Sequence, residues 1–262
     1  MHPAERMRES SIRHCSLGLF EVAFPIFAGL KYNAFSIMIC WRPGLISFLF
    51  LTGFAMLISL IGMSGTGKSH WSMKMSEFGF RRFCCDDLIT EKLVSELKHN
   101  DGTGMDLGEW MGFPSDPGYE EREARYLACE MEVLGEVLDW IERKAHNAEN
   151  IVIDTTGSVI YTGDVLLKRM KALTRVVHFV TPVEVRDALL QKYMAKPRPV
   201  LWRGLFNREA GESVEDALKR CYYGLLNSRE ELYCTLADVK VDFFTRRDPE
   251  FSIPDFLDLL SK

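Results

Sequence analysis

The feature that most constrains this chain is a glycine-rich turn between an apolar run and a stretch of helix formers. Residues 56–61 are apolar apart from Ser59, and residues 62–69 read Gly-Met-Ser-Gly-Thr-Gly-Lys-Ser. This spacing matches G-x-x-x-x-G-K-[ST], a loop whose backbone N–H groups surround phosphate oxygens. The lysine carries positive charge to the β- and γ-phosphates, and the serine hydroxyl ligates Mg²⁺. The sequence therefore predicts a nucleotide phosphate site formed by Gly62, Gly65, Thr66, Gly67, Lys68 and Ser69.

Composition limits the partners and the compartment. The net charge of the 262 residues is -5, and no cluster of Lys and Arg is present that could hold a nucleic-acid backbone. We therefore expect no nucleic-acid partner. The seven cysteines show no C-x-x-C spacing. They therefore indicate a reducing compartment and a cytoplasmic catalytic domain.

The N-terminal segment is unusually apolar. Between residues 14 and 67 the only formal charges are Glu21, Lys31 and Arg42. The apolar run 44–61 approaches the roughly 20 residues of a membrane helix, but the strand before the glycine turn uses its second half. Three alternatives stay open for residues 1–54: a membrane anchor or hairpin within 15–54, a targeting leader, or an apolar extension packed on the domain.

The remaining pattern alternates between strands and helices. Short apolar runs at 80–85, 151–154, 176–180 and 239–244 predict strands. Helices are expected at 69–77, 88–97, 120–144, 165–173, 182–194, 213–227 and 229–236, with a loop-rich insertion at 99–119. This order predicts a doubly wound parallel α/β sheet in a three-layer sandwich of the P-loop, nucleoside-monophosphate-kinase type. Its expected domain spans residues 55–247, followed by an amphipathic tail at 248–262.

Polar residues follow the strands at the edge where such sheets bind ligands. Asp86 follows the second strand, and Asp154 ends the third. Asp154 either supports Mg²⁺ or caps the next turn through its side chain. Arg198, between two prolines in the loop 196–203, is either part of a lid over the phosphates or part of a solvated basic loop.

The order of these motifs over residues 56–244 resembles the shikimate kinase family. The likeness rests on the phosphate loop, on Asp86 with Ile89, on Arg198-Pro199-Val200-Leu201 and on Arg229-Glu230-Glu231-Leu232-Tyr233. It implies that Asp86 binds ring hydroxyls and acts as base, that Arg198 closes the site, and that Gly157 lines the acceptor pocket. It also implies that Arg122 and Arg229 hold the carboxylate of the acceptor.

Two departures from the family pattern affect the acceptor. Cys84 stands where the family has an acidic residue near Mg²⁺, and Thr155-Thr156 replace two glycines of its triple-glycine turn. No counterpart of the family's adenine-stacking arginine is recognisable, so the purine contact is unassigned.

The resemblance implies an ATP- and Mg²⁺-dependent phosphotransferase with an alcohol group as acceptor. The γ-phosphoryl group would go to a hydroxyl of a small anionic acceptor, shikimate or a related hydroxy acid. The alternatives are a kinase for another sugar acid or polyol, and a nucleotide-binding regulatory or membrane-tethered P-loop protein without kinase activity.

Overall fold

A computed structural model describes residues 37–42, 45–50, 55–99, 101–144, 149–196 and 198–260. The chain divides into two units, which meet in the sequence between Phe54 and Ala55. In the first unit, β1 (Ile37–Arg42) and β2 (Leu45–Phe50) form an antiparallel pair. The other residues of the segment 15–54, on which the anchor prediction depends, lie outside the described residues. Within the described ranges, no helix is long and apolar enough to cross a membrane.

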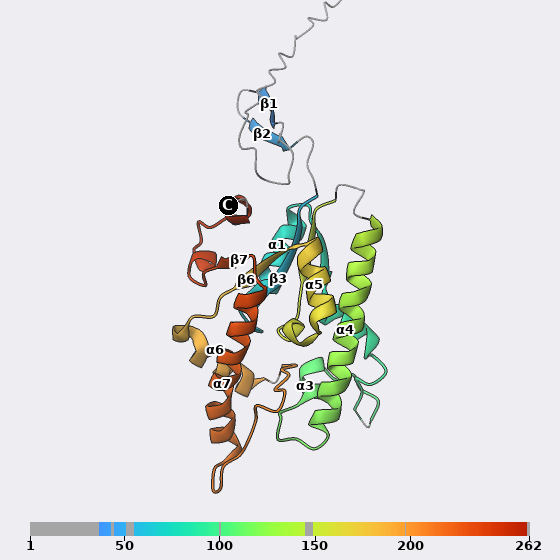
Figure 1. The fold of residues 1–262 in the computed structure, drawn as a ribbon, viewed down its shortest axis with the longest axis vertical. Helices are drawn as coiled ribbons and strands as arrows, with labels where there is room; N and C mark the ends of the chain where they lie inside the picture. Colours follow the sequence, from blue (N-terminus) through green and yellow to red (C-terminus); the bar gives the residue numbers. More distant parts are fainter. Residues whose placement is uncertain are drawn as a thin grey trace, which may run out of the picture. The chain divides into compact units, whose positions relative to one another are not determined.

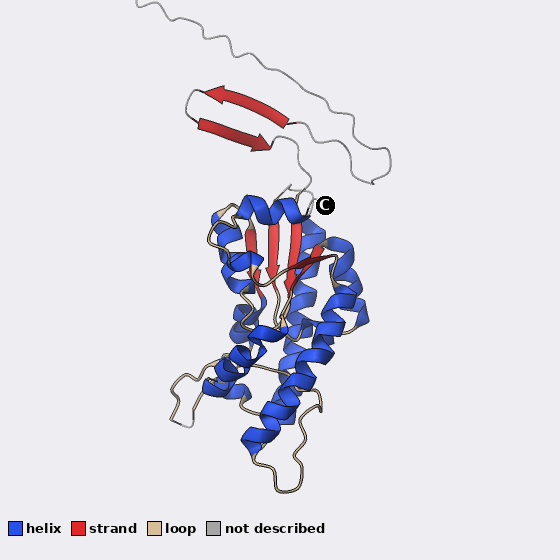
Figure 2. Cartoon of the chain, turned by 90° about the vertical axis from the view of Figure 1, so that its left-hand side faces the viewer, coloured by secondary structure: helices blue, strands red, loops and turns tan. Residues whose placement is uncertain are grey.

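The second unit is built on five parallel strands in the order β4-β5-β3-β6-β7 (Figures 1 and 2). These strands are β3 (Leu57–Ile61), β4 (Arg81–Cys84), β5 (Ile151–Asp154), β6 (Arg175–Phe179) and β7 (Val239–Val241). Because β3 lies between β5 and β6, the strand order reverses direction beside it, and the loop after β3 opens at that switch point. The predicted doubly wound parallel sheet is confirmed.

Helices cover both faces of this sheet, as Figure 2 shows. They are α1 (Lys68–Glu77), α2 (Cys85–Lys92), α3 (Leu107–Met111), α4 (Tyr119–Lys144), α5 (Asp164–Leu173), α6 (Arg186–Ala195), α7 (Val214–Leu236) and α8 (Ile253–Leu260). Alternate side chains of β3 enter two separate cores. Ile58 and Leu60 pack with Trp71 of α1, whereas Ile61 packs with residues of α4 and α7. This alternation follows from the period of two in a strand and confirms the three-layer sandwich.

The insertion at residues 99–119 and the region after Pro182 are more ordered than loop composition suggests. The insertion contains α3, whose first turn is capped by the Asp106 side chain, which accepts a hydrogen bond from the Glu109 backbone N–H. After Pro182 the chain makes a short 3₁₀ turn, Val183–Val185, before α6 begins at Arg186.

The late helical region is one helix, not the two segments 213–227 and 229–236. Asn227 and Ser228 are residue types typical of helix ends, yet α7 continues through them to Leu236. Its buried residues include Leu225, Leu226, Arg229 and Tyr233, so packing on both sides of the expected break keeps the helix continuous. Tertiary contacts here override local propensity.

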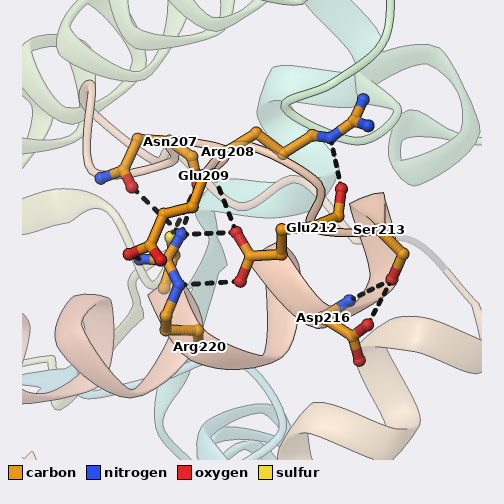
Figure 3. A network of polar contacts seen from close by, with 8 residues as sticks. Asn207, Arg208, Glu209, Glu212, Ser213, Asp216 and Arg220 are labelled. Carbon is orange, nitrogen blue, oxygen red and sulfur yellow. Dashed lines mark hydrogen bonds and ion pairs between the residues drawn. The ribbon is translucent and has the colours of Figure 1, made fainter.

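A polar network fixes the start of α7 (Figure 3). Ser213 caps the helix, accepting a hydrogen bond from the Asp216 backbone N–H at 3.1 Å. Arg220 donates to both carboxylate oxygens of Glu212 at 2.9 and 2.8 Å. These hydrogen bonds hold the pKa of Glu212 at about 2. The bidentate pair ties the loop before α7 to the second turn of the helix.

Candidate active site

The glycine-rich loop takes a conformation that requires glycine. Gly62 has φ +138°, and a Cβ atom there would lie 2.8 Å from the carbonyl oxygen of Phe179. Gly67 has φ +103° and immediately precedes α1, which begins at Lys68. Both glycines adopt backbone conformations that L side chains rarely allow. The loop therefore leads into a helix N-terminus, whose free N–H groups and dipole favour an anion.

Lys68 lies at the base of this loop and is buried. Its Nζ donates to the carbonyl oxygens of Gly62 at 2.8 Å and Met63 at 3.2 Å. Burial lowers the pKa of the Lys68 amine, while the nearby carboxylates of Asp154 and Asp86 oppose that shift. Its hydrogen bonds hold the ammonium beside the loop, where it is available to a phosphate.

A cleft of about 520 Å³ opens beside the loop. The residues that line it come from the phosphate loop, α2, α3, the turn after β5 and the loop after α6: Ser64, Gly65, Gly67, Lys68, Ser69, His70, Asp86, Asp87, Thr90, Asp106, Leu107, Gly108, Gly157, Lys196, Arg198 and Pro199. The structure thus brings together Lys68, Ser69, Asp86, Gly157 and Arg198 from the predicted site. Thr66, within the loop, is buried, and its hydroxyl donates to the carbonyl oxygen of Met63 at 2.8 Å.

Asp86 borders the cleft from the first turn of α2. Its side chain is open to the cleft and accepts a hydrogen bond from the Tyr126 hydroxyl at 3.2 Å. The surrounding protein raises the pKa of the Asp86 carboxyl by desolvation, and the charge of Lys68 opposes this shift. A carboxylate with a raised pKa is a stronger proton acceptor than an ordinary surface aspartate.

Arg198 reaches the phosphate loop from the opposite wall. Its guanidinium lies 3.4 Å from the hydroxyl oxygen of Ser64 and lines the cleft. Lys196, in the same loop, pairs with Asp106 at 2.8 Å. This ion pair links the proline-containing loop to the start of α3, so two walls of the cleft are connected.

Asp154 ends β5 as expected, but its partners are protein groups. One carboxylate oxygen accepts hydrogen bonds from Arg82 at 2.8 Å and from the Ser72 hydroxyl at 3.0 Å. Asp154 is buried and is not among the residues that line the cleft. Ser69, Asp86 and Asp87 are among the residues with side-chain oxygens that line the cleft, and oxygen ligands suit a hard cation such as Mg²⁺.

Arg229 lies behind the phosphate loop, outside the cleft lining. It is 1% exposed and donates to the carbonyl oxygens of Gly157 at 3.0 Å and Leu201 at 2.6 Å. Its guanidinium also lies over the ring of Tyr161. These contacts connect α7 to the turn after β5 and to the loop after α6.

Arg122 is likewise engaged away from the cleft. It donates to the carbonyl oxygens of Met111 at 3.1 Å and Pro117 at 3.0 Å, which belong to the insertion. Neither Arg122 nor Arg229 is among the residues that line the cleft.

Glu130 supports the site by bonding to the turn after β5, and it is not among the residues predicted from the sequence. It is 2% exposed and accepts hydrogen bonds from the hydroxyls of Thr156 and Ser158, the latter at 2.6 Å. Burial raises the pKa of Glu130 to about 7. The signal was present in the sequence, because Glu130 interrupts the apolar stripe of α4 between Tyr126 and Val133.

Comparisons with known proteins return structures only, since no family model and no curated protein matches the chain. Shikimate kinases are among the solved structures it resembles. The enzyme from Acinetobacter baumannii in complex with shikimate is 21% identical, with 72% of this chain and 84% of that chain covered and a TM-score of 0.45. Shikimate kinase from Bacteroides thetaiotaomicron is 18% identical, with 79% of this chain and 94% of that chain covered and a TM-score of 0.46. Dephospho-CoA kinase from Campylobacter jejuni is 14% identical, with 78% of this chain and 93% of that chain covered and a TM-score of 0.41.

Proposed function

We propose that this chain is an ATP-dependent kinase that transfers the γ-phosphoryl group to a hydroxyl of a small acceptor. The observation that carries the proposal is the shared cleft. A phosphate loop, a carboxylate at its far wall and an arginine above it all face the same space of about 520 Å³. Phosphoryl transfer needs such an arrangement, because catalysis depends mainly on positioning and on charge stabilisation.

Each residue has a task in this proposal. Gly62, Gly65, Thr66 and Gly67 shape the loop, and Lys68 neutralises the phosphates. Ser69 would hold Mg²⁺, which would neutralise negative charge on the phosphates. Asp86 orients the acceptor hydroxyl and accepts its proton, and Arg198 stabilises charge on the transferring group. Asp154 supports the metal side of the site through Arg82 and Ser72, with which it is hydrogen-bonded.

Shikimate or a related hydroxy acid is the first acceptor to test, because the order of motifs resembles the shikimate kinase family. In this proposal Arg229 and Arg122 hold the acceptor carboxylate, with Gly157 beside it, which requires both side chains to leave their present carbonyl partners. Support for an anionic acceptor in the present geometry comes from Arg198, a cation that lines the cleft.

A polyol or sugar acceptor is the second candidate. Three carboxylates are among the groups that line the cleft, those of Asp86, Asp87 and Asp106. Both predicted acceptor arginines are bonded to backbone carbonyls elsewhere. The hydroxyl groups of a polyol can donate hydrogen bonds to these three carboxylates. The negative charge of an acceptor carboxylate would instead be repelled by the three aspartates.

The test measures ADP release by the full chain with Mg²⁺-ATP alone, with shikimate, and with a panel of polyols and sugar acids. Stimulation by one compound identifies the acceptor class. Asp86→Asn should lower the stimulated rate by about 10²- to 10⁴-fold. Glu91→Gln, at an exposed carboxylate of the same helix that is not among the residues lining the cleft, serves as the matched control. ATP binding without stimulation by any compound would favour a nucleotide-binding regulator and would overturn the kinase proposal.

Lys68→Met provides a second control on the chemistry. It should abolish turnover with every acceptor, because the ammonium that meets the phosphates is gone. Lys74→Met makes the same change on the exposed side of α1 and should leave turnover unchanged. Equal activity of the Lys68 variant would place the reaction outside the phosphate loop.

Membrane association through residues 15–54 stays a prediction. Fractionation of the full chain, compared with a chain that begins near Thr52, tests it. Recovery of both chains in the aqueous fraction after an alkaline wash would contradict an anchor.

A further inference from the structure

A buried histidine outside the cleft lacks the partners that its ring requires. His178 is the fourth residue of β6 and is 0% exposed, and within the described residues neither ring nitrogen has a hydrogen-bond partner. Leaving a polar group buried without a partner costs free energy, so native structures rarely tolerate it. A ligand on at least one ring nitrogen would therefore stabilise the buried ring.

Helix α7 presents two metal-ligating side chains to this ring. Glu230 and Cys234 are four positions apart and therefore lie on the same helix face. A carboxylate oxygen of Glu230 lies 3.5 Å from Nε2 of His178, and the other lies 3.8 Å from Sγ of Cys234. One ligand atom from each of the three residues lies within 4.8 Å of the others.

We propose that His178, Glu230 and Cys234 form a zinc site. In tetrahedral zinc sites the metal lies about 2.0–2.3 Å from N, O and S ligands, which places neighbouring ligand atoms about 3.3–3.8 Å apart. Each Glu230 oxygen already has one contact of such a length, one with His178 and the other with Cys234. Cys234 is only partly buried, so its side chain can turn to complete the site. An imidazole, a carboxylate and a thiolate together suit Zn²⁺ better than Mg²⁺, which prefers oxygen ligands.

The charges of the site also balance. On binding, the thiol of Cys234 gives its proton to solvent, and the new Zn–S bond replaces the S–H bond. One Zn²⁺ with a thiolate and a carboxylate then has no net charge, which suits a position beside a buried strand. Glu230 keeps 21% of its side chain exposed, which leaves the ion a route of entry and allows a water molecule as fourth ligand.

The site is separate from the cleft but is connected to it. None of the three residues lines the cleft. Tyr233 lies between Glu230 and Cys234 in the sequence. Its ring packs against His178 with 5.1 Å between ring centres, and its hydroxyl donates to the carbonyl oxygen of Gly157. Gly157 lines the cleft. A zinc ion would therefore fasten α7 to β6 directly behind the turn that shapes the cleft.

Cobalt provides the test, because Co²⁺ replaces Zn²⁺ and reports a thiolate ligand by a charge-transfer absorption band. The full chain, purified without a metal-affinity tag, is titrated with Co²⁺ in excess Mg²⁺, which occupies oxygen-ligand sites in the cleft. We expect one Co²⁺ per chain, a thiolate band and the visible bands of tetrahedral cobalt, all removed by one equivalent of Zn²⁺. The absence of a saturable thiolate band in the wild-type chain would overturn the proposal.

Two variants and a matched control assign the ligands. Cys234→Ser should lose the thiolate band, whereas Cys221→Ser, the same change on the same helix, should retain it, because the Cys221 thiol faces the carbonyl oxygen of Asn207. Glu230→Gln should weaken Zn²⁺ binding by about tenfold or more. Zn²⁺ should raise the melting temperature of the wild-type chain and of Cys221→Ser, but not that of Cys234→Ser. Persistence of the band in Cys234→Ser, or unchanged affinity in Glu230→Gln, would contradict the site.

Discussion

At the scale of single residues, Glu130 shows how the site couples to pH. Its carboxyl has a pKa of about 7 in the folded chain, raised from 4.5 because it is buried. Between these two values the folded state binds a proton that the unfolded state has released. The stabilising contribution of Glu130 to the free energy of unfolding is therefore complete below pH 4.5 and is lost as the pH rises through 7.

This difference predicts that the free energy of unfolding falls by about 3 kcal/mol between pH 4.5 and pH 7 through Glu130 alone. Glu130→Gln should remove that part of the slope, because an amide does not titrate. Urea unfolding at several pH values measures it, with Glu120→Gln on the exposed face of the same helix as control. A slope unchanged in the Glu130 variant would show that the group titrates normally in the fold.

Arg229 is the residue whose role the structure changes most. The family resemblance implies that it holds an acceptor carboxylate, yet its guanidinium is fully enclosed and bonded to the carbonyl oxygens of Gly157 and Leu201. A motif in the sequence specifies the residue type and its place on a helix. Whether the side chain points into the cleft or behind it depends on segments more than 25 residues away, which a local pattern does not contain.

We predict that Arg229→Met lowers the free energy of unfolding by about 2–4 kcal/mol, because it leaves two buried carbonyl groups with fewer donors. Arg203→Met is the control, since Arg203 also lies over the ring of Tyr161 but is exposed. Chemical denaturation compares the two. A folded and equally stable Arg229 variant that has lost only acceptor affinity would instead support the acceptor role.

At the scale of elements, local patterns identified most of the sheet. The strand and helix around Gly62–Ser69 follow from the glycine spacing, and the buried strands follow from short apolar runs. What the patterns could not supply are contacts between distant elements. The pairing of Asp154 with Arg82 joins adjacent strands that are 72 residues apart in sequence, and the continuity of α7 depends on side chains packed against it.

Helix α8, in the tail predicted at residues 248–262, packs onto the sheet. Phe256 is 0% exposed and stacks on Trp71 of α1, with 5.1 Å between ring centres. We predict that Phe256→Ala destabilises the domain by about 3–5 kcal/mol. Phe244→Ala, at a side chain that is 56% exposed, should have little effect. Thermal or urea unfolding measures both, and equal stability of the two variants would mean that α8 does not contribute to the folded core.

At the scale of the whole molecule, the cleft and both hydrophobic cores lie in the unit that begins at Ala55. The sheet starts at Leu57, and the Met56 backbone N–H already donates to the Asn150 side chain at 2.9 Å. Every group assigned to phosphates, acceptor or zinc belongs to this unit.

We accordingly predict that a chain of residues 55–262 folds cooperatively and retains the Mg²⁺-ATP turnover of the full chain within about twofold, a difference of roughly 0.4 kcal/mol in activation free energy. A chain that begins at Ser59 is the matched control. It loses Leu57 and Ile58, which pair with β5 and β6, and so removes the first half of the central strand. That chain should fail to fold, because the lost residues lie between both neighbours of β3. Mg²⁺-ATP turnover and unfolding curves of the full chain, of residues 55–262 and of the chain that begins at Ser59 test this prediction. If residues 55–262 fold but have lost turnover, the N-terminal unit contributes to the reaction and the domain boundary lies elsewhere.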